Sequence, residues 1–108
     1  MATKAARRRD IGARLERALI ASAATRGCAI GVVEADWVHW ASVTFTGARH
    51  RLTLDLEATS GGEAWLAALP ELELPLRGHL VADLQVVALA ARDGRLRAEL
   101  EALTVEEC

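Results

Sequence analysis

The sequence predicts an α+β protein in which one antiparallel sheet has helices packed on one face. Apolar residues near the N-terminus recur at a helical spacing. The middle and the end of the chain alternate apolar with polar residues as strands do, and glycine or proline turns separate these segments. The expected order is α-β-β-β-α-β-β, in a single domain over residues 1–108 with residues 1–6 disordered.

The first element is an amphipathic helix that reaches Arg26. Its apolar stripe recurs at every fourth position, while Arg14, Glu16 and Arg17 lie off the stripe. Gly27 stands where a left-handed C-terminal cap belongs. The stripe consists of Ile11, Leu15, Leu19 and Ala23.

Three short strands are predicted next, joined by two turns. The strands are expected at 28–33, 37–46 and 51–57, with turns at 34–36 and 47–50. This arrangement places apolar residues opposite one another on the dry face of the sheet. The expected pairs are Phe45 with Leu52, Val43 with Leu54 and Ala41 with Leu56.

A second, short helix follows the strands. The stretch 59–62 breaks the alternation and offers an N-cap, so the helix is expected over 63–69. Pro70 ends it, and residues 71–75 form an extended connector into the closing hairpin.

The last third of the chain predicts a long antiparallel hairpin with limbs at 80–90 and 95–105. A two-residue Asp93-Gly94 loop would set Val86 opposite Glu101. A three-residue loop from Arg92, with Gly94 in the left-handed conformation, keeps the apolar residues of both limbs on one face. The three-residue loop is therefore expected, and it pairs Val86 with Leu100, Ala88 with Ala98 and Ala90 with Leu96.

This register leaves apolar residues on the outer face of the hairpin as well. A strand that is apolar on both sides usually has both sides covered, so we expect a subunit interface here. The alternative is a half-exposed β-branched strand. The expected interface residues are Val81, Val87, Leu89, Leu103 and Val105.

Composition limits the range of partners. The net charge is −2, too small to imply a polyanionic or polycationic partner for the whole chain. There is no secretory apolar segment and no apolar run near the membrane-spanning length. Cys28 and Cys108 do not form a disulfide framework, so a cytoplasmic protein with reduced thiols is expected.

The N-terminal segment is locally basic, whereas the region from Glu63 to the end holds nine acidic residues against four arginines. One copy's basic helix could contact another copy's acidic hairpin, as in a head-to-tail ring. Aromatic residues do not interleave with the basic ones, so nucleic acid is the less favoured partner. The residues expected to make this electrostatic contact are Arg7, Arg8, Arg9, Arg14 and Arg17.

The polar residues do not predict an enzyme. His39, His50 and His79 lack metal-ligand spacing and are expected to be structural. Asp55 and Glu57 could act as an acid–base pair, but alternating carboxylates are typical of the solvated side of a strand. No nucleophile or phosphate-loop motif is present, so no catalytic residue, metal or cofactor is expected.

Several short stretches together resemble one family. They are the strand entry at 47–54, the strand entry Gly78-His79-Leu80-Val81, and the Asp93-Gly94 hairpin with Arg97-Ala98 and the closing Ala102-Leu103. They look like the small tail-terminator or tail-completion proteins of long-tailed phages and gene-transfer agents, although Arg49 stands where that family carries an acidic residue. The resemblance implies an α+β protein that forms a hexameric ring on a phage tail tube, and hence a virion-associated location.

Three functions are therefore considered. The first is a non-enzymatic assembly protein that associates with itself, with a phage-tail-like ring as its most concrete form. The second is a chaperone-like dimer that binds a protein or peptide client along a sheet face or edge. The third is a small-molecule site between sheet and helices, lined by Trp37 and His39.

Overall fold

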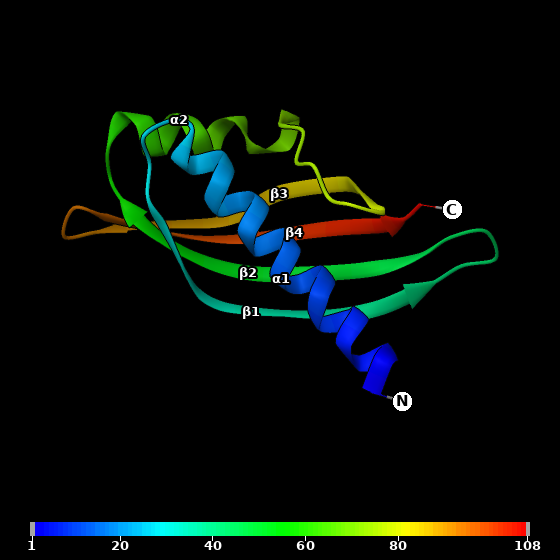
Figure 1. Cartoon of the computed structure of the whole chain (residues 1–108). Coiled ribbons are helices and arrows are strands. Elements are labelled where there is room, and N and C mark those ends of the chain that lie inside the picture. Colours follow the sequence, from blue (N-terminus) through cyan, green and yellow to red (C-terminus); the bar gives the residue numbers. More distant parts are fainter. Residues whose placement is uncertain (1, 108) are drawn as a thin grey trace.

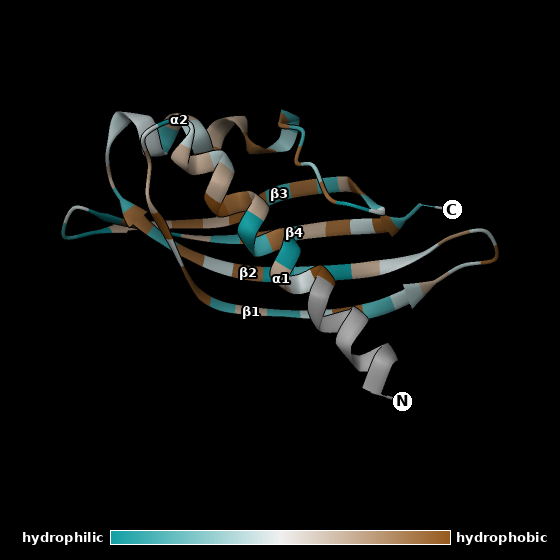
Figure 2. Cartoon of the chain, viewed as in Figure 1, coloured by the Kyte–Doolittle hydropathy of each residue, from teal (hydrophilic) through white to brown (hydrophobic). Residues whose placement is uncertain are grey.

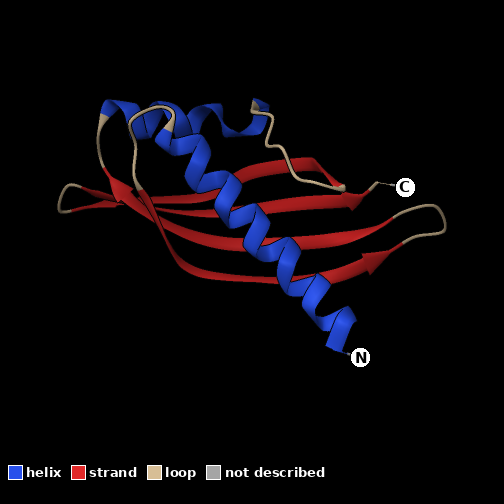
Figure 3. Ribbon diagram, in the orientation of Figure 1, coloured by secondary structure: helices blue, strands red, loops and turns tan. Residues whose placement is uncertain are grey.

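The computed structural model describes the backbone of residues 2–107 and the side chains of residues 11–107. The chain forms one four-stranded antiparallel sheet in the order β1-β2-β4-β3, with both α-helices on one face (Figures 1 and 3). The predicted α+β class is confirmed. The elements are α1 (Ala2–Ala24), β1 (Ile30–Ala41), β2 (Thr46–Glu57), α2 (Ser60–Ala68), the 3₁₀ helix η1 (Leu69–Glu71), β3 (His79–Arg92) and β4 (Arg95–Glu106).

Helix α1 crosses the sheet diagonally and buries its predicted stripe, Ile11, Leu15, Leu19 and Ala23 (Figure 1). Since the side chains before Ile11 are not described, the predicted disorder of residues 1–6 stays a prediction. Gly27 has a φ of 72°, as expected for a left-handed residue after a helix.

The strand β1 replaces the two strands predicted at 28–33 and 37–46, and the predicted turn at 34–36 was wrong. β1 runs unbroken from Ile30 to Ala41, with a β-bulge between Val32 and Glu34. Glu34 and Asp36 are polar because they lie on the exposed face of an edge strand, where water covers them. The polar residues on the exposed face of β1 were therefore wrongly interpreted as a turn at 34–36.

The register of β1 with β2 also differs from the prediction. The loop lies at 42–45, and Gly47 to His50 form the start of β2. Ser42 closes the loop: its N–H donates to the Phe45 carbonyl at 2.7 Å, and its hydroxyl accepts from the Phe45 N–H at 3.1 Å. The helix-side pairs are Ile30 with Leu56, Val32 with Leu54, Ala35 with Leu52 and Trp37 with His50.

The closing hairpin turns through two residues, Asp93 and Gly94, with φ values of 52° and 74°. The predicted three-residue loop was wrong, although Gly94 is left-handed as expected. A bulge between Val86 and Ala88 then restores the predicted pairing of Val86 with Leu100, and a second bulge lies between Val81 and Asp83. The strand β3 thus shifts its register within its length rather than at its tip.

Helix α2 completes the layer above the sheet. Its N-cap is Thr59, from the stretch 59–62 that was expected to supply the cap, so the helix begins at Ser60 rather than at Glu63. The Thr59 side chain accepts a hydrogen bond from the Gly62 N–H at 3.0 Å. Trp65 is fully buried, and its indole N–H donates to Ser22 Oγ of α1 at 3.0 Å. The leucines of β2 and β4 form the floor of this core, and hydrophobic segments alternate with polar ones along these strands in Figure 2.

Candidate interaction surface on the uncovered face of the sheet

The two faces of the sheet have different environments. The helix side is packed beneath α1 and α2, whereas no described element covers the opposite face, which we call the outer face (Figure 1). On β2 and β4 the outer face consists of the odd-numbered residues from Gly47 to Glu57 and from Arg95 to Val105. An antiparallel sheet can leave one face in water, so exposure alone does not mark a site.

One end of the outer face is apolar across all four strands. A single row of partners joins Trp40 of β1, Gly47 of β2, Val105 of β4 and Leu80 of β3. The next row adds an apolar residue on each of two strands. We call the five large residues of these rows the apolar end: Val38, Trp40, Leu80, Leu103 and Val105. Val38 and Leu80 are 62% and 57% exposed.

Trp40 lies over Gly47 at this end. A Cβ on Gly47 would lie 3.0 Å from Trp40 Nε1 and 1.9 Å from the carbonyl oxygen of Thr104. Glycine is therefore required at this position by close approach rather than by a turn. Among the described side chains, Trp40 Nε1 is the buried polar atom that lacks a hydrogen-bond partner. The indole is held there by packing on the glycine.

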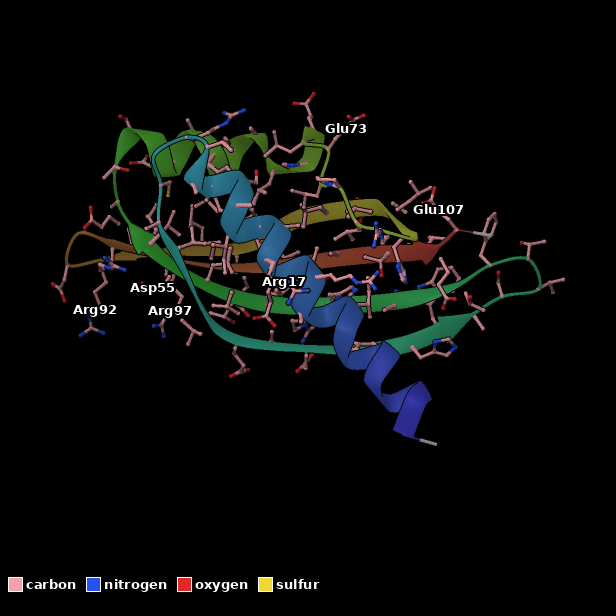
Figure 4. The ribbon with its side chains drawn as sticks, in the orientation of Figure 1. Arg17, Asp55, Glu73, Arg92, Arg97 and Glu107 are labelled. Carbon is pink, nitrogen blue, oxygen red and sulfur yellow. The ribbon has the colours of Figure 1, made fainter. Side chains whose placement is uncertain are left out.

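The rest of the outer face carries charges of both signs. Arg51 pairs with Glu101 at 3.1 Å and Arg95 with Asp55 at 2.9 Å, both between β2 and β4. The hydrogen bond from Arg95 lowers the pKa of the Asp55 carboxyl, and the same bond raises the pKa of the guanidinium. Arg97 projects on the side away from the helices in Figure 4.

These charges alternate in sign across the line between β2 and β4. In three rows a residue of β2 faces an oppositely charged residue of β4: Arg51 faces Glu101, Asp55 faces Arg97 and Glu57 faces Arg95. Next to the apolar end the face is hollowed. This hollow has a volume of about 400 Å³ and is lined by Val38, Arg49, Arg51, Asp83 and Leu103, among others.

The five residues predicted as an interface do not share this face. Leu103 and Val105 lie on the outer face. Val81 and Leu89 pair with Thr104 and Ala98 and therefore point to the helix side, where Val81 packs against the core. The bulges cause this difference, because each one moves the following residues of β3 to the opposite face. Val87 is itself the bulge residue. The predicted single surface was wrong, and the large apolar residues of the outer face come from three strands, β1, β3 and β4, rather than two.

The residues predicted to make an electrostatic contact between copies do not form one group among the described side chains. Arg14 donates through Nη1 to the Arg77 carbonyl at 2.5 Å, so it links α1 to the connector within the chain. Arg17 is exposed on α1 (Figure 4). The side chains of Arg7, Arg8 and Arg9 lie outside the described residues.

The histidine with the most perturbed environment is His50. It lies in β2 rather than in a loop and is 4% exposed; its Nε2 is 2.9 Å from Thr104 Oγ1. Since that hydroxyl lies 3.4 Å from the Ala48 carbonyl and can donate to it, the imidazole donates to the hydroxyl. Burial, together with His79 nearby, lowers the pKa of His50 from 6.5 to about 4. Even-numbered residues from Ala48 to Leu56 face the core, and this alternation could have placed His50.

The Trp37 ring packs beside His50, with ring centroids 6.1 Å apart. A hollow of about 230 Å³ separates α1 from β1 at this point; Trp37 and His50 are among the residues that line it. Of the two residues predicted to line a small-molecule site, Trp37 lines this hollow and His39 does not. Among the described residues no group of three or more His, Cys, Asp or Glu could hold a metal ion. Cys28 is a buried free thiol, and Cys108 lies outside the described residues.

Comparison with known proteins adds no relative. No family model matches the chain, no curated protein matches it, and no solved structure matches it. Within the described residues, no helix has both the length and the hydrophobicity that a membrane span requires.

Proposed function

We propose that this protein is a non-enzymatic assembly module whose copies associate through the outer face of the sheet. The observation that supports this proposal is the apolar end, where β1, β3 and β4 contribute large apolar residues to a face that no described element covers. Val38 and Leu80 remain more than half exposed there. Contiguous apolar surface of this kind is typical of sites where a protein binds another protein.

The size of the face suits a stable pair. Strands about 4.8 Å apart, with a rise of about 3.3 Å per residue, give a face of roughly 19 by 36 Å when four strands pair over their lengths. Two such faces would bury about 1,400 Å² in total, within the range of specific protein interfaces. Two sheets pack in this way in β-sandwiches, with their strands nearly aligned.

The charges favour a second copy as the occupant. A two-fold axis parallel to the strands, between β2 and β4, would set each β2 residue over the β4 residue of the same row. Arg51 would then meet Glu101 of the partner subunit, and Asp55 would meet Arg97 of the partner subunit. Opposite charges thus face each other across the pair, while apolar end meets apolar end.

Mass in solution tests the proposal, by light scattering on a size-exclusion column. We expect a dimer for the native protein and a monomer for Leu80→Glu, which places a charge in the apolar end. Leu89→Glu is the matched control, because Leu89 lies on the same strand with a similar exposure, 54% against 57%, but on the helix side. A monomeric native protein, or a dimer that only Leu89→Glu disrupts, would overturn the proposal.

A six-copy ring is the form that the resemblance to tail-terminator proteins implies. A ring requires a heterologous contact in addition to, or in place of, the two-fold one. This form would be supported if the native protein has the mass of six chains in solution and the Leu80→Glu variant has a smaller mass. The cytoplasm, or the virion for the ring, is the location that we propose with it.

A module that binds a peptide client is the second candidate. It is favoured by a different observation, the free edge of β1 at one side of the sheet.

A further inference from the structure

The two edges of the sheet differ in how they are protected. β3 carries two bulges, and the connector before it forms a bridge from Leu76 to His79. β1 has one bulge, after Val32, and then pairs with β2 without interruption from Glu34 to Ala41. This segment contains neither proline nor lysine, the residues that commonly block an edge. β1 therefore presents a long, regular edge that can accept a further strand.

A hollow lies beside this edge. It has a volume of about 230 Å³ and opens between α1 and β1. Gly12, Ala13 and Ala35 line it with small residues, and Gly12 also lets the helix approach Trp37, since a Cβ there would lie 2.8 Å from the indole nitrogen. An added strand would direct alternate side chains toward the helix side, where one of them would enter this hollow.

The charge of the residues that line the hollow favours a basic side chain in it. Glu16 lines the hollow, and its described lining holds neither lysine nor arginine. Asp36 also lines it, but its pairing with Arg51 turns its side chain to the outer face, so Glu16 supplies the negative charge. The Trp37 indole also lines the hollow, and an aromatic ring attracts cations. His50 is turned to Thr104 and stays neutral near pH 7, so it does not oppose a cation.

We propose that β1 accepts an extended segment of a partner protein as a fifth strand, with one basic side chain of that segment seated in the edge hollow. Backbone hydrogen bonds supply affinity, and the hollow supplies specificity, as in other cases where a peptide adds to a sheet edge. This site does not rest on the pairing of outer faces, because the edge stays free in that dimer.

The probe is a short synthetic peptide of alternating threonine and valine with one central lysine. Titrated to millimolar concentration against isotope-labelled protein, it should shift the amide resonances of Glu34–Ala41 and of Gly12. The same peptide with a central glutamate should bind about tenfold more weakly. The peptide methylated on every second backbone nitrogen should not bind, since it cannot complete a ladder.

A charge-reversal variant tests the hollow. Glu16→Lys should reverse the preference, so that the glutamate peptide binds better than the lysine peptide. Glu73→Lys makes the same change of charge on the connector, outside the hollow, and should leave the preference unchanged. If neither β1 nor Gly12 responds, or if the methylated peptide binds equally well, the proposal is wrong. Shifts of β1 that follow protein concentration without peptide would identify a second copy as the occupant and overturn it as well.

Discussion

The imidazole of His50 combines three properties of its position in the fold. It is buried, it donates to Thr104, and it packs beside Trp37. Protonation of the second ring nitrogen would create an imidazolium cation in a poorly solvated site. The charge of His79 nearby disfavours this cation further. The unfolded chain therefore binds this proton more readily than the folded one.

Stability should consequently fall with acid between two defined values. Above pH 6.5 both states are neutral at His50 and the full stability is present; it declines as the pH falls toward 4, by up to about 3 kcal/mol. Urea unfolding across this range measures the effect. His50→Gln should flatten the dependence, whereas His39→Gln, an exposed position on the neighbouring strand, should keep it. Asp55 acts in a lower window, because its pKa lies below 3.8.

The sequence predicts a turn at 47–50, which includes His50, because Gly47 begins this stretch. Glycine before a polar run usually marks a turn. Here the glycine is needed beneath Trp40 and against β4, a reason that depends on residues far apart in the sequence. The leucines at 52, 54 and 56 were placed correctly, since strict alternation is a local signal.

At the scale of the elements, Gly47 lets the backbone of β2 lie close to Thr104 of β4. Gly47→Ala should destabilise the protein by about 3 kcal/mol, because the new methyl would lie 1.9 Å from a backbone oxygen that cannot move alone. In Gly31→Ala, on β1, the new methyl would lie 3.9 Å from the Asp55 carbonyl oxygen, an ordinary contact, so stability should change by less than about 1 kcal/mol. Urea unfolding compares the two, and similar losses for both variants would contradict this account.

Local patterns predict the type of an element more easily than the alignment of one strand with the next. The helix stripe, the Thr59 cap and the last hairpin all follow from local patterns. The bulges of β3 do not follow from such patterns. A bulge adds one residue to a strand, so the residues after it change face without any signal in the local alternation. The hairpin register was therefore correct at Val86 and wrong at the tip.

In the whole molecule, the helices pack on one face of the sheet, and no described element covers the outer face. If copies pair through the open face, association should add to stability by mass action. The thermal midpoint of the native protein should then rise with protein concentration, while that of Leu80→Glu should not. Calorimetry at several concentrations checks this, and a constant midpoint for the native protein would count against pairing.

The apolar end of the outer face could not be predicted in full from the sequence. Leu103 and Val105 were recognised, but Trp40, Val38 and Leu80 join them through pairings between strands far apart in the chain. The charge pattern has the same origin, since Arg51 and Glu101 are fifty residues apart.

The two bulges also bear on how this chain can change in length. Removing one residue at Val87 or near Ala82 would leave every remaining pair of β3 with the neighbour it has now, and would merely straighten the strand. A deletion inside β2 or β4 would instead invert part of a strand and expose leucines. Natural variants that lose a single residue from the sheet should therefore lose it at a bulge, from β3 or at Val33 of β1.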